Sequence, residues 1–223
     1  MIKQVIWSST IDWPNQLSTV LFFGGCNFTC SYCHNRELDK QEDISFDEIL
    51  EKLIERKSIV DHIILSGGEP TISKDYFYVL EKLRGSGFKI GIHTNGTKPF
   101  VVSDSVDKYG VSFVGLDIKA GSDSAYSEYY NNSFSEFSFS NVMYTLYLIS
   151  HKKDKIQLDV RTTLGKHLSE RELIRIGRKI GGYTKEWNLQ YEVQDGKQIK
   201  YFNQKQYDDI VDDLRDFVSV KYR

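Results

Sequence analysis

Short apolar runs rich in β-branched and aromatic residues alternate with helix-forming segments along this 223-residue chain. Such runs are typical of strands that are buried on both faces of a sheet. Strands that alternate with helices imply parallel pairing through right-handed crossovers. A closed eightfold barrel needs roughly 250 residues, so the sequence favours an α/β fold with an open, incomplete (β/α)6 barrel. The six expected strands are residues 17–23, 61–66, 88–93, 111–118, 155–163 and 187–193.

The segments between these runs have helical periodicity. We expect one helix after the SGGEP motif, up to about residue 84, and another over residues 141–150. Two further helices are expected to begin with capping boxes, in which a serine and a glutamate satisfy free backbone N–H groups. These are residues 45–57, with Ser45 and Glu48, and residues 169–180, with Ser169 and Glu172.

No linker or internal repeat beyond the β-α unit divides the sequence, and we expect residues 1–223 to form one domain. Residues 121–140 are rich in Ser, Tyr, Phe and Asn, and we expect a loop with a short helix whose aromatic side chains pack on the barrel. The alternative is a surface for a partner protein. Residues 203–218 are predicted to form a last helix packed on the barrel, with these side chains on one face: Tyr207, Ile210, Val211, Leu214 and Phe217.

Composition narrows the classes of function. The net charge is −2 and no run of Lys and Arg stands out, which argues against nonspecific nucleic-acid binding. No segment approaches the roughly 20 apolar residues that a membrane span needs. The amino-terminal residues lack the apolar core and cleavage site of a secretory signal. We therefore expect a cytoplasmic protein with no membrane or nucleic-acid partner.

Polar motifs follow the predicted strands at their carboxyl ends. In sheets of parallel strands these ends meet at one edge, where ligands bind. We therefore expect the motifs to form one site. They read GGCNFTC, SGGEP, HTNG, DIK and RTT.

Cys26, Cys30 and Cys33 are the three cysteines of the chain, in a C-x3-C-x2-C pattern. A clustered, odd number of cysteines indicates a metal or catalytic site rather than disulfides. One interpretation is tetrahedral zinc, with the adjacent His34 as a fourth ligand. The other is an iron–sulfur cube, in which three thiolates leave one iron open for catalysis.

The cysteine pattern resembles that of the radical S-adenosylmethionine (SAM) superfamily, C-x3-C-x-aromatic-C, with Tyr32 as the aromatic residue. The resemblance implies a partial barrel and a [4Fe-4S] cluster held by Cys26, Cys30 and Cys33. It also implies that SAM binds the open iron and is cleaved reductively to a 5′-deoxyadenosyl radical. The fourth ligand of the cluster is then the cosubstrate.

A closer resemblance joins TIDWP, GGCNFTCSYCHNREL, LSGGEPT, HTNG, LDIKA and RTTL. Together they look like the activating enzymes of glycyl-radical enzymes, nearest the second type of anaerobic ribonucleoside-triphosphate reductase activating protein. The similarity covers residues 8–191. It implies that the chain generates a glycyl radical on an anaerobic ribonucleotide reductase and takes its electron from a flavodoxin- or ferredoxin-type donor.

The same resemblance implies roles for individual residues. Tyr32 would lie near the adenine, and Asp12 would touch the substrate peptide or a nearby cation. The remaining predicted SAM contacts are Gly67, Gly68, Glu69, Thr94, Asn95, Asp117, Lys119 and Arg161. Several of these residues also have an interpretation without a function. Asp12 could be a turn residue, and Asp117 could form a surface ion pair with Lys119. Arg161 could pair with a carboxylate on a helix.

The sequence departs from the family in two places. His93 stands where pyruvate formate-lyase type activating enzymes have an aspartate that helps to hold a cation, and the segment Trp13-Pro14-Asn15 replaces Gly-Pro-Gly. A cation site is therefore in question. His62, His151 and His167 are interpreted as structural or solvated.

Two other classes of function remain open at this point. One is a radical SAM reaction on a small molecule, such as a deazapurine precursor, or on a peptide. The other is a structural zinc module or an electron carrier, which would normally close its cluster with four cysteines. No acid–base residue set of the kind found in hydrolases is evident, so the cluster and SAM would supply the chemistry.

Overall fold

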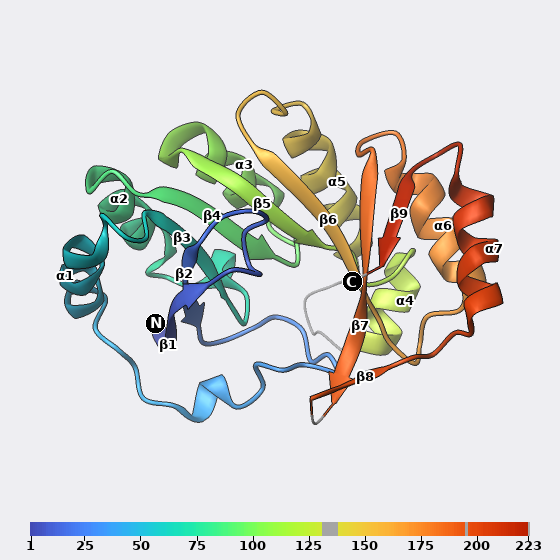
Figure 1. Ribbon diagram of the computed structural model, residues 1–223, viewed down its shortest axis with the longest axis horizontal. Helices are drawn as coiled ribbons and strands as arrows, with labels where there is room; N and C mark the ends of the chain where they lie inside the picture. The colour runs from blue at the N-terminus through green and yellow to red at the C-terminus, as the bar shows by residue number, and fades with distance from the viewer. Residues whose placement is uncertain (131–137, 195, 223) are drawn as a thin grey trace.

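The computed structural model of the chain describes residues 1–130, 138–194 and 196–222. Within these residues the six expected strands pair in parallel and in sequence order, from β2 to β7. Figure 1 shows the resulting curved sheet. The strands of the sheet are β1 (Ile2–Ser9), β2 (Ser18–Phe23), β3 (His62–Gly67), β4 (Lys89–Thr94), β5 (Val111–Asp117), β6 (Gln157–Leu164), β7 (Glu186–Gln194), β8 (Lys197–Ile199) and β9 (Ser219–Tyr222).

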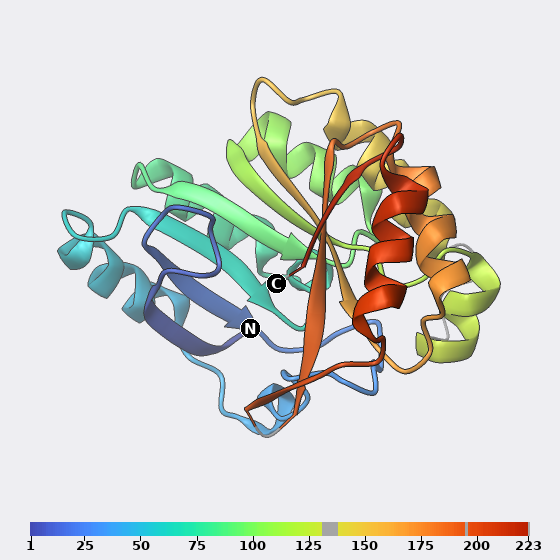
Figure 2. The same cartoon turned by 45° about the vertical axis from the view of Figure 1, so that its right-hand side comes forward.

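The helices lie on the outside of this curved sheet (Figures 1 and 2). They are α1 (Phe46–Arg56), α2 (Tyr76–Gly85), α3 (Pro99–Tyr109), α4 (Asp123–Tyr130), α5 (Ser138–Ser150), α6 (Glu170–Ile180) and α7 (Gln204–Leu214), with short 3-10 turns at Leu38–Lys40 and Pro70–Ile72. In the described parts of the chain, no helix is both long and apolar enough to span a membrane. Helix α3 is not predicted by the sequence pattern, because its valines and serines have low helix propensity.

The two edges of the sheet explain why the barrel stays open. Strand β1 pairs antiparallel with β2 at one end, and β8 pairs antiparallel with β7 at the other. Among the described residues β1 and β8 do not pair with each other, so the barrel is incomplete as expected. These strands and β9 are not predicted by the sequence, because β8 and β9 are very short and β1 mixes polar and apolar residues, as exposed edge strands do.

The helix starts differ in part from the expected capping boxes. Ser45 is the N-cap of α1, but its side chain makes no capping hydrogen bond, so the predicted box with Glu48 is wrong. The Ser169 hydroxyl does accept a hydrogen bond from the Glu172 N–H at 3.2 Å. The Glu172 carboxylate accepts instead from the Gly121 N–H at 2.7 Å, which ties α6 to the loop after β5.

The carboxyl-terminal helix packs on the barrel exterior but is shorter than predicted. Helix α7 ends at Leu214 rather than near residue 218, and the chain then turns back to place β9 parallel to β7. Phe217 lies beyond the helix and is 47% exposed, so its predicted place on the apolar face is wrong. The side chains that do face the protein interior are Tyr207, Ile210 and Leu214.

The segment 121–140 contains the expected short helix, α4, and the start of α5. Tyr126 and Phe139 are both buried, and their ring centroids lie 6.2 Å apart. Their packing against the barrel matches the expectation. Residues 131–137 of this segment lie outside the described residues.

A small apolar cluster, separate from the main core, is formed by Trp13, Val20, Ile64 and Phe113. Its centre is Trp13, which is stacked on Phe113 with ring centroids 5.1 Å apart and donates its indole N–H to Gln157 at 3.2 Å. Gly91 makes room for the indole, because a Cβ there would lie 3.0 Å from a Trp13 ring carbon. Trp13 thereby fixes the β1–β2 loop, and with it Asp12, inside the barrel.

Candidate active site

A cavity of about 700 Å³ lies at the carboxyl ends of the parallel strands. Every site residue that the sequence predicts lines it, although those residues come from six separate segments of the chain. They are Asp12, Cys26, Cys30, Tyr32, Cys33, Gly67, Gly68, Glu69, Thr94, Asn95, Asp117, Lys119 and Arg161. The structure thus brings the predicted residues together, while their individual roles stay predictions.

The three cysteines lie on one loop between β2 and the Leu38–Lys40 turn. Cys30 is buried, whereas Cys26 and Cys33 are exposed. Burial raises the pKa of the Cys30 thiol. Backbone and side-chain bonds hold the loop: Arg36 donates to the Cys30 carbonyl at 2.7 Å, and Asn35 donates to the Gly67 carbonyl at 2.6 Å.

The donor set of this loop fits an iron–sulfur cluster better than a single ion. The three thiols line the same cavity, yet among the described residues no three His, Cys, Asp or Glu side chains are placed to hold one metal ion. A cube with several irons spreads its thiolate ligands further apart than a tetrahedral zinc does. The zinc interpretation, with His34 as a ligand, is therefore not supported.

The glycines of SGGEP bring two backbone segments into direct contact. Gly67 has φ +110°, and a Cβ there would lie 2.4 Å from the Phe23 backbone. A Cβ on Gly68 would lie 2.0 Å from the Gly25 carbonyl oxygen. The Glu69 N–H donates to that same carbonyl at 2.8 Å. These glycines therefore allow the SGGEP turn to pack directly against the start of the cysteine loop. They leave room for a ligand as well.

The Glu69 carboxylate is fully buried and joins the ends of β3 and β4. It accepts four hydrogen bonds, from the N–H and hydroxyl of Thr71, the hydroxyl of Thr94 and the N–H of Asn95. The Asn95 side chain in turn donates to Asn27 in the cysteine loop at 2.7 Å. Because the Glu69 carboxylate is engaged by donors of the protein itself, the predicted contact of Glu69 with SAM would have to be made by its backbone atoms.

Asp117, Lys119 and Arg161 form one ionic group across β5 and β6. Asp117 lies 2.9 Å from Arg161 Nε and 3.6 Å from Lys119 Nζ. Burial raises the pKa of Asp117, but its two cationic neighbours outweigh burial, so the pKa lies below its usual value. Both cations are thus held by a charged carboxylate inside the cavity, rather than forming the surface pair or helix pair considered above.

His93 links the β1–β2 loop to the glycine turn. Its Nε2 lies 2.9 Å from the Asp12 carbonyl oxygen and its Nδ1 lies 3.3 Å from the Ser66 hydroxyl. Burial and the nearby Arg161 charge lower the pKa of His93 to about 3, so the ring is neutral. A neutral ring donates from Nε2 to the carbonyl and accepts at Nδ1 from Ser66. His93 is therefore a cross-link between two loops.

Asp12 is the site residue on the β1–β2 loop. Its carboxylate accepts a hydrogen bond from the Ser9 hydroxyl at 2.5 Å and lies 4.0 Å from His93 Nδ1. Because His93 is neutral, this contact is not an ion pair. Asp12 thus lines the cavity with a negative charge.

Tyr32 lies between groups from two later loops. The Lys119 ammonium is 5.9 Å from its ring centroid, and the His167 ring is stacked nearly parallel to it, with centroids 6.0 Å apart. His167 Nε2 also lies 3.3 Å from the Lys119 carbonyl oxygen. The interpretation of His167 as structural or solvated misses these contacts, because no local pattern in the sequence shows that the loop after β6 reaches the cysteine loop.

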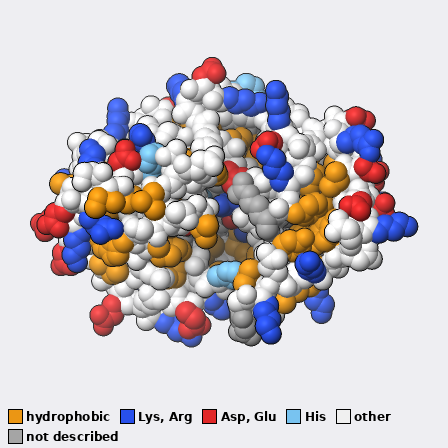
Figure 3. Space-filling model, viewed as in Figure 1, with side chains coloured by type: hydrophobic (Ala, Val, Ile, Leu, Met, Phe, Trp, Pro, Cys, Tyr) orange, Lys and Arg blue, Asp and Glu red, His pale blue; other side chains and the backbone are white. Residues whose placement is uncertain are grey.

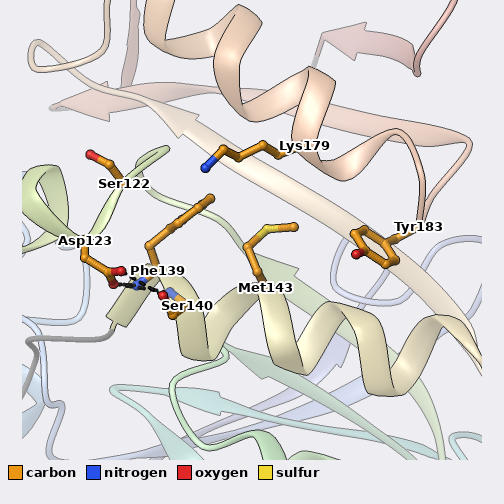
Figure 4. Close-up of a pocket in the computed structure, with 7 residues that line it drawn as sticks. All are labelled: Ser122, Asp123, Phe139, Ser140, Met143, Lys179 and Tyr183. Atoms are coloured by element: carbon orange, nitrogen blue, oxygen red, sulfur yellow. Dashed lines mark hydrogen bonds between the residues drawn. The ribbon is translucent and has the colours of Figure 1, made fainter.

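A second, shallower cavity of about 450 Å³ lies outside the barrel, between α4, α5 and α6 (Figure 4). Its charged side chains serve the fold. Asp123 caps α5 by accepting from the Phe139 and Ser140 N–H groups, and the Lys179 ammonium lies 4.6 Å from the centroid of the Phe139 ring. This cavity contains none of the predicted site residues.

Several known proteins are similar to this chain in sequence. Residues 20–180 match the family model described as the radical SAM superfamily. The chain is 29% identical over 184 residues to a Methanocaldococcus jannaschii protein named as a candidate glycyl-radical enzyme activating enzyme, which covers 81% of this chain and 75% of that protein. It is also 37% identical over 81 residues to the 7-carboxy-7-deazaguanine synthase of Haemophilus influenzae, over 36% of this chain and 37% of that enzyme.

Among solved structures, Streptococcus suis SuiB bound to S-adenosylmethionine has the same fold. It matches with a TM-score of 0.62 and 16% identity, over 89% of this chain and 48% of SuiB. The chain therefore spans about half the length of SuiB, and this likeness concerns the fold alone.

Proposed function

Because this chain belongs to the radical SAM superfamily, we propose that it generates a glycyl radical on a partner enzyme, and that the partner is an anaerobic ribonucleotide reductase. Membership of the superfamily makes a [4Fe-4S] cluster and SAM its cofactors. The observation that carries the proposal is that all the predicted site residues line one cavity in a barrel left open between β1 and β8. An opening at the side of the barrel gives access to a loop of another protein.

When bound, the cluster supplies an electron and SAM supplies the group that removes a hydrogen atom from the substrate. The residues of this chain bind and orient. Cys26, Cys30 and Cys33 would hold three irons and leave the fourth to SAM. Asp117, Lys119 and Arg161 offer both charges that an amino acid moiety needs for recognition, and Tyr32 offers an aromatic face for the adenine. Asp12 stands on the substrate side.

A second candidate function is a radical reaction on a small molecule. It is favoured by the partial similarity to 7-carboxy-7-deazaguanine synthase. The greater extent of the match to the activating enzyme, 81% of the chain against 36%, supports the first proposal.

We further propose a flavodoxin- or ferredoxin-type protein as the electron donor and the cytoplasm as the location. None of the three cysteines forms a disulfide, which suits a reducing compartment.

The test is an anaerobic assay. The protein is reconstituted with iron and sulfide, reduced with dithionite and given SAM, with and without an anaerobic ribonucleotide reductase from the same organism. We expect 5′-deoxyadenosine formation to rise with the reductase, and a glycyl radical signal to appear on the reductase by electron paramagnetic resonance. Deoxyadenosine formation that ignores the reductase but rises with a purine precursor would support the second candidate and reject the first.

A further inference from the structure

We propose that the β7–β8 hairpin and the β1–β2 loop form the surface that binds the substrate, and that this surface takes an uncharged, extended peptide segment of the partner enzyme. This inference rests on the proposed function and adds which residues recognise the segment. The residues are Gln190, Val193 and Gln198 on the hairpin and Ile11 on the loop, all of which line the cavity.

The position of this surface follows from the sheet. The predicted cofactor contacts occupy the ends of β2 to β6, which leaves the remaining walls of the cavity to the β1–β2 loop and the β7–β8 hairpin. These two elements lie at opposite ends of the strand order. They therefore flank the open side of the barrel, where a segment from another protein would enter. In Figure 3, hydrophobic side chains lie on both sides of a central hollow.

Two side-chain amides in the cavity have no protein partner. Among the described residues, neither Gln190 nor Gln198 makes a side-chain hydrogen bond, although Gln157 and Gln194 on the same sheet both do. A glutamine amide offers donors and an acceptor, which complement the N–H and C=O groups of a peptide backbone. The two amides are thus available to an extended chain.

Two exposed apolar side chains line the cavity, Ile11 from the β1–β2 loop and Val193 from the β7–β8 hairpin. Ile11 is 84% exposed and Val193 is 37% exposed. Exposed apolar residues that line a binding cavity suit the aliphatic or aromatic side chains of a bound segment. They offer nothing to a phosphate or a carboxylate.

The charges of the cavity indicate an uncharged ligand. The cationic side chains among its described lining residues are Lys119 and Arg161, and both are already paired with Asp117. His93 is neutral and Asp12 adds a negative charge beside the β1–β2 loop. Lys119 and Arg161 together carry one positive charge more than Asp117 neutralises, and the proposed function assigns that excess to the carboxylate of SAM. A nucleotide with several phosphate groups would therefore find no further Lys or Arg among the described lining residues and would be repelled by Asp12, whereas a neutral peptide would not.

The test uses the cluster-loaded protein with SAM and a fluorescent peptide that carries the glycine-containing carboxyl terminus of an anaerobic ribonucleotide reductase from the same organism. The variants are Gln190→Leu, Gln198→Leu and the double variant. Gln4→Leu is the matched control, because Gln4 is an exposed glutamine of β1 that does not line the cavity. Peptide affinity is measured by anisotropy, and SAM affinity is measured separately without peptide.

We expect each single variant to weaken peptide binding about fivefold and the double variant about twentyfold, from the loss of one and two net hydrogen bonds. SAM affinity should stay the same in all variants, and Gln4→Leu should match the wild type. Guanosine triphosphate should not compete with the peptide.

Each contrary outcome has a distinct meaning. Normal peptide binding by the double variant would overturn the assignment of the hairpin and leave the proposed function standing. Competition by guanosine triphosphate would overturn the preference for an uncharged segment. Failure of the wild-type protein to bind the peptide, together with no response to the intact reductase, would reject both this inference and the proposed function.

Discussion

The two sides of the cavity are built in different ways. On the side formed by β3, β4 and β5, polar groups such as the Glu69 carboxylate and the Asp117 carboxylate are bonded within the protein. On the hairpin side, the amides of Gln190 and Gln198 have no such bond among the described residues. The difference indicates that the fold itself fixes the side of the cavity around Glu69 and Asp117, whereas the hairpin, which we propose binds the substrate, leaves two side-chain amides available to solvent or to a ligand.

The largest effect is expected where the glycine turn packs against the cysteine loop. Gly68→Ala would place a Cβ 2.0 Å from the Gly25 carbonyl oxygen, and no side-chain rotation can relieve a contact with backbone. We expect a loss of about 3 kcal/mol in the free energy of unfolding and failure to assemble the cluster, measured by denaturation and by iron content. Gly85→Ala, which meets nothing within 4 Å, is the control and should assemble normally.

Glu69→Ala tests whether the buried carboxylate holds β3 and β4 together. The change leaves four hydrogen-bond donors without their acceptor, so we expect the free energy of unfolding to fall by about 3 kcal/mol. Glu69→Gln retains one acceptor oxygen and should lose less. Equal stability of the alanine variant and the wild type would show that these donors find other acceptors.

His93 gives the cavity a measurable dependence on pH. The pKa of His93 is lowered to about 3 in the folded protein, against about 6.5 in an unfolded chain. Between these values the unfolded state binds the additional proton, so stability falls as the pH drops below about 6.5. At pH 5 this costs about 2 kcal/mol relative to neutral pH. In His93→Gln, the fall in the free energy of unfolding between pH 7 and pH 5 should be smaller by about this amount, which chemical denaturation at the two pH values measures. An equal fall in the variant and the wild type would show that the ring of His93 is charged in the folded protein.

The smallest effect concerns Tyr32. His167→Ala removes the ring stacked on Tyr32, and an aromatic pair contributes about 1 kcal/mol. We expect SAM affinity to fall about fivefold, which isothermal titration of the cluster-loaded protein would measure. His167→Phe retains a ring and should bind SAM nearly as well as the wild type. If both variants bound SAM with the same affinity, the ring at position 167 would not affect SAM binding, and the predicted contact of Tyr32 with the adenine would be wrong.

The sequence predicts most of the residues that we propose hold the cofactors and few of those that we propose bind the substrate. The six parallel strands and the convergence of Cys26, Gly67 and Asp117 follow from periodicity and from the rule that parallel strands end at one edge. The cross-link from His93 to Asp12 could not be predicted, because the two residues are 81 positions apart and meet only in the folded chain. Gln190 is a single glutamine in a predicted strand and Gln198 lies in β8, which the sequence does not predict. No local signal distinguishes either from a solvated residue.

Trp13 has a consequence for the order in which the protein folds. Its indole N–H bonds to Gln157, a residue 144 positions later in the chain, and contacts of such long sequence separation form slowly because a large loop must close first. The β1–β2 loop therefore cannot settle until β6 is in place, although β1 and β2 are made first. We expect the part of the cavity formed by the β1–β2 loop to mature after the cysteine loop. Under the proposed function, iron would then be loaded into a chain that is not yet able to bind its partner.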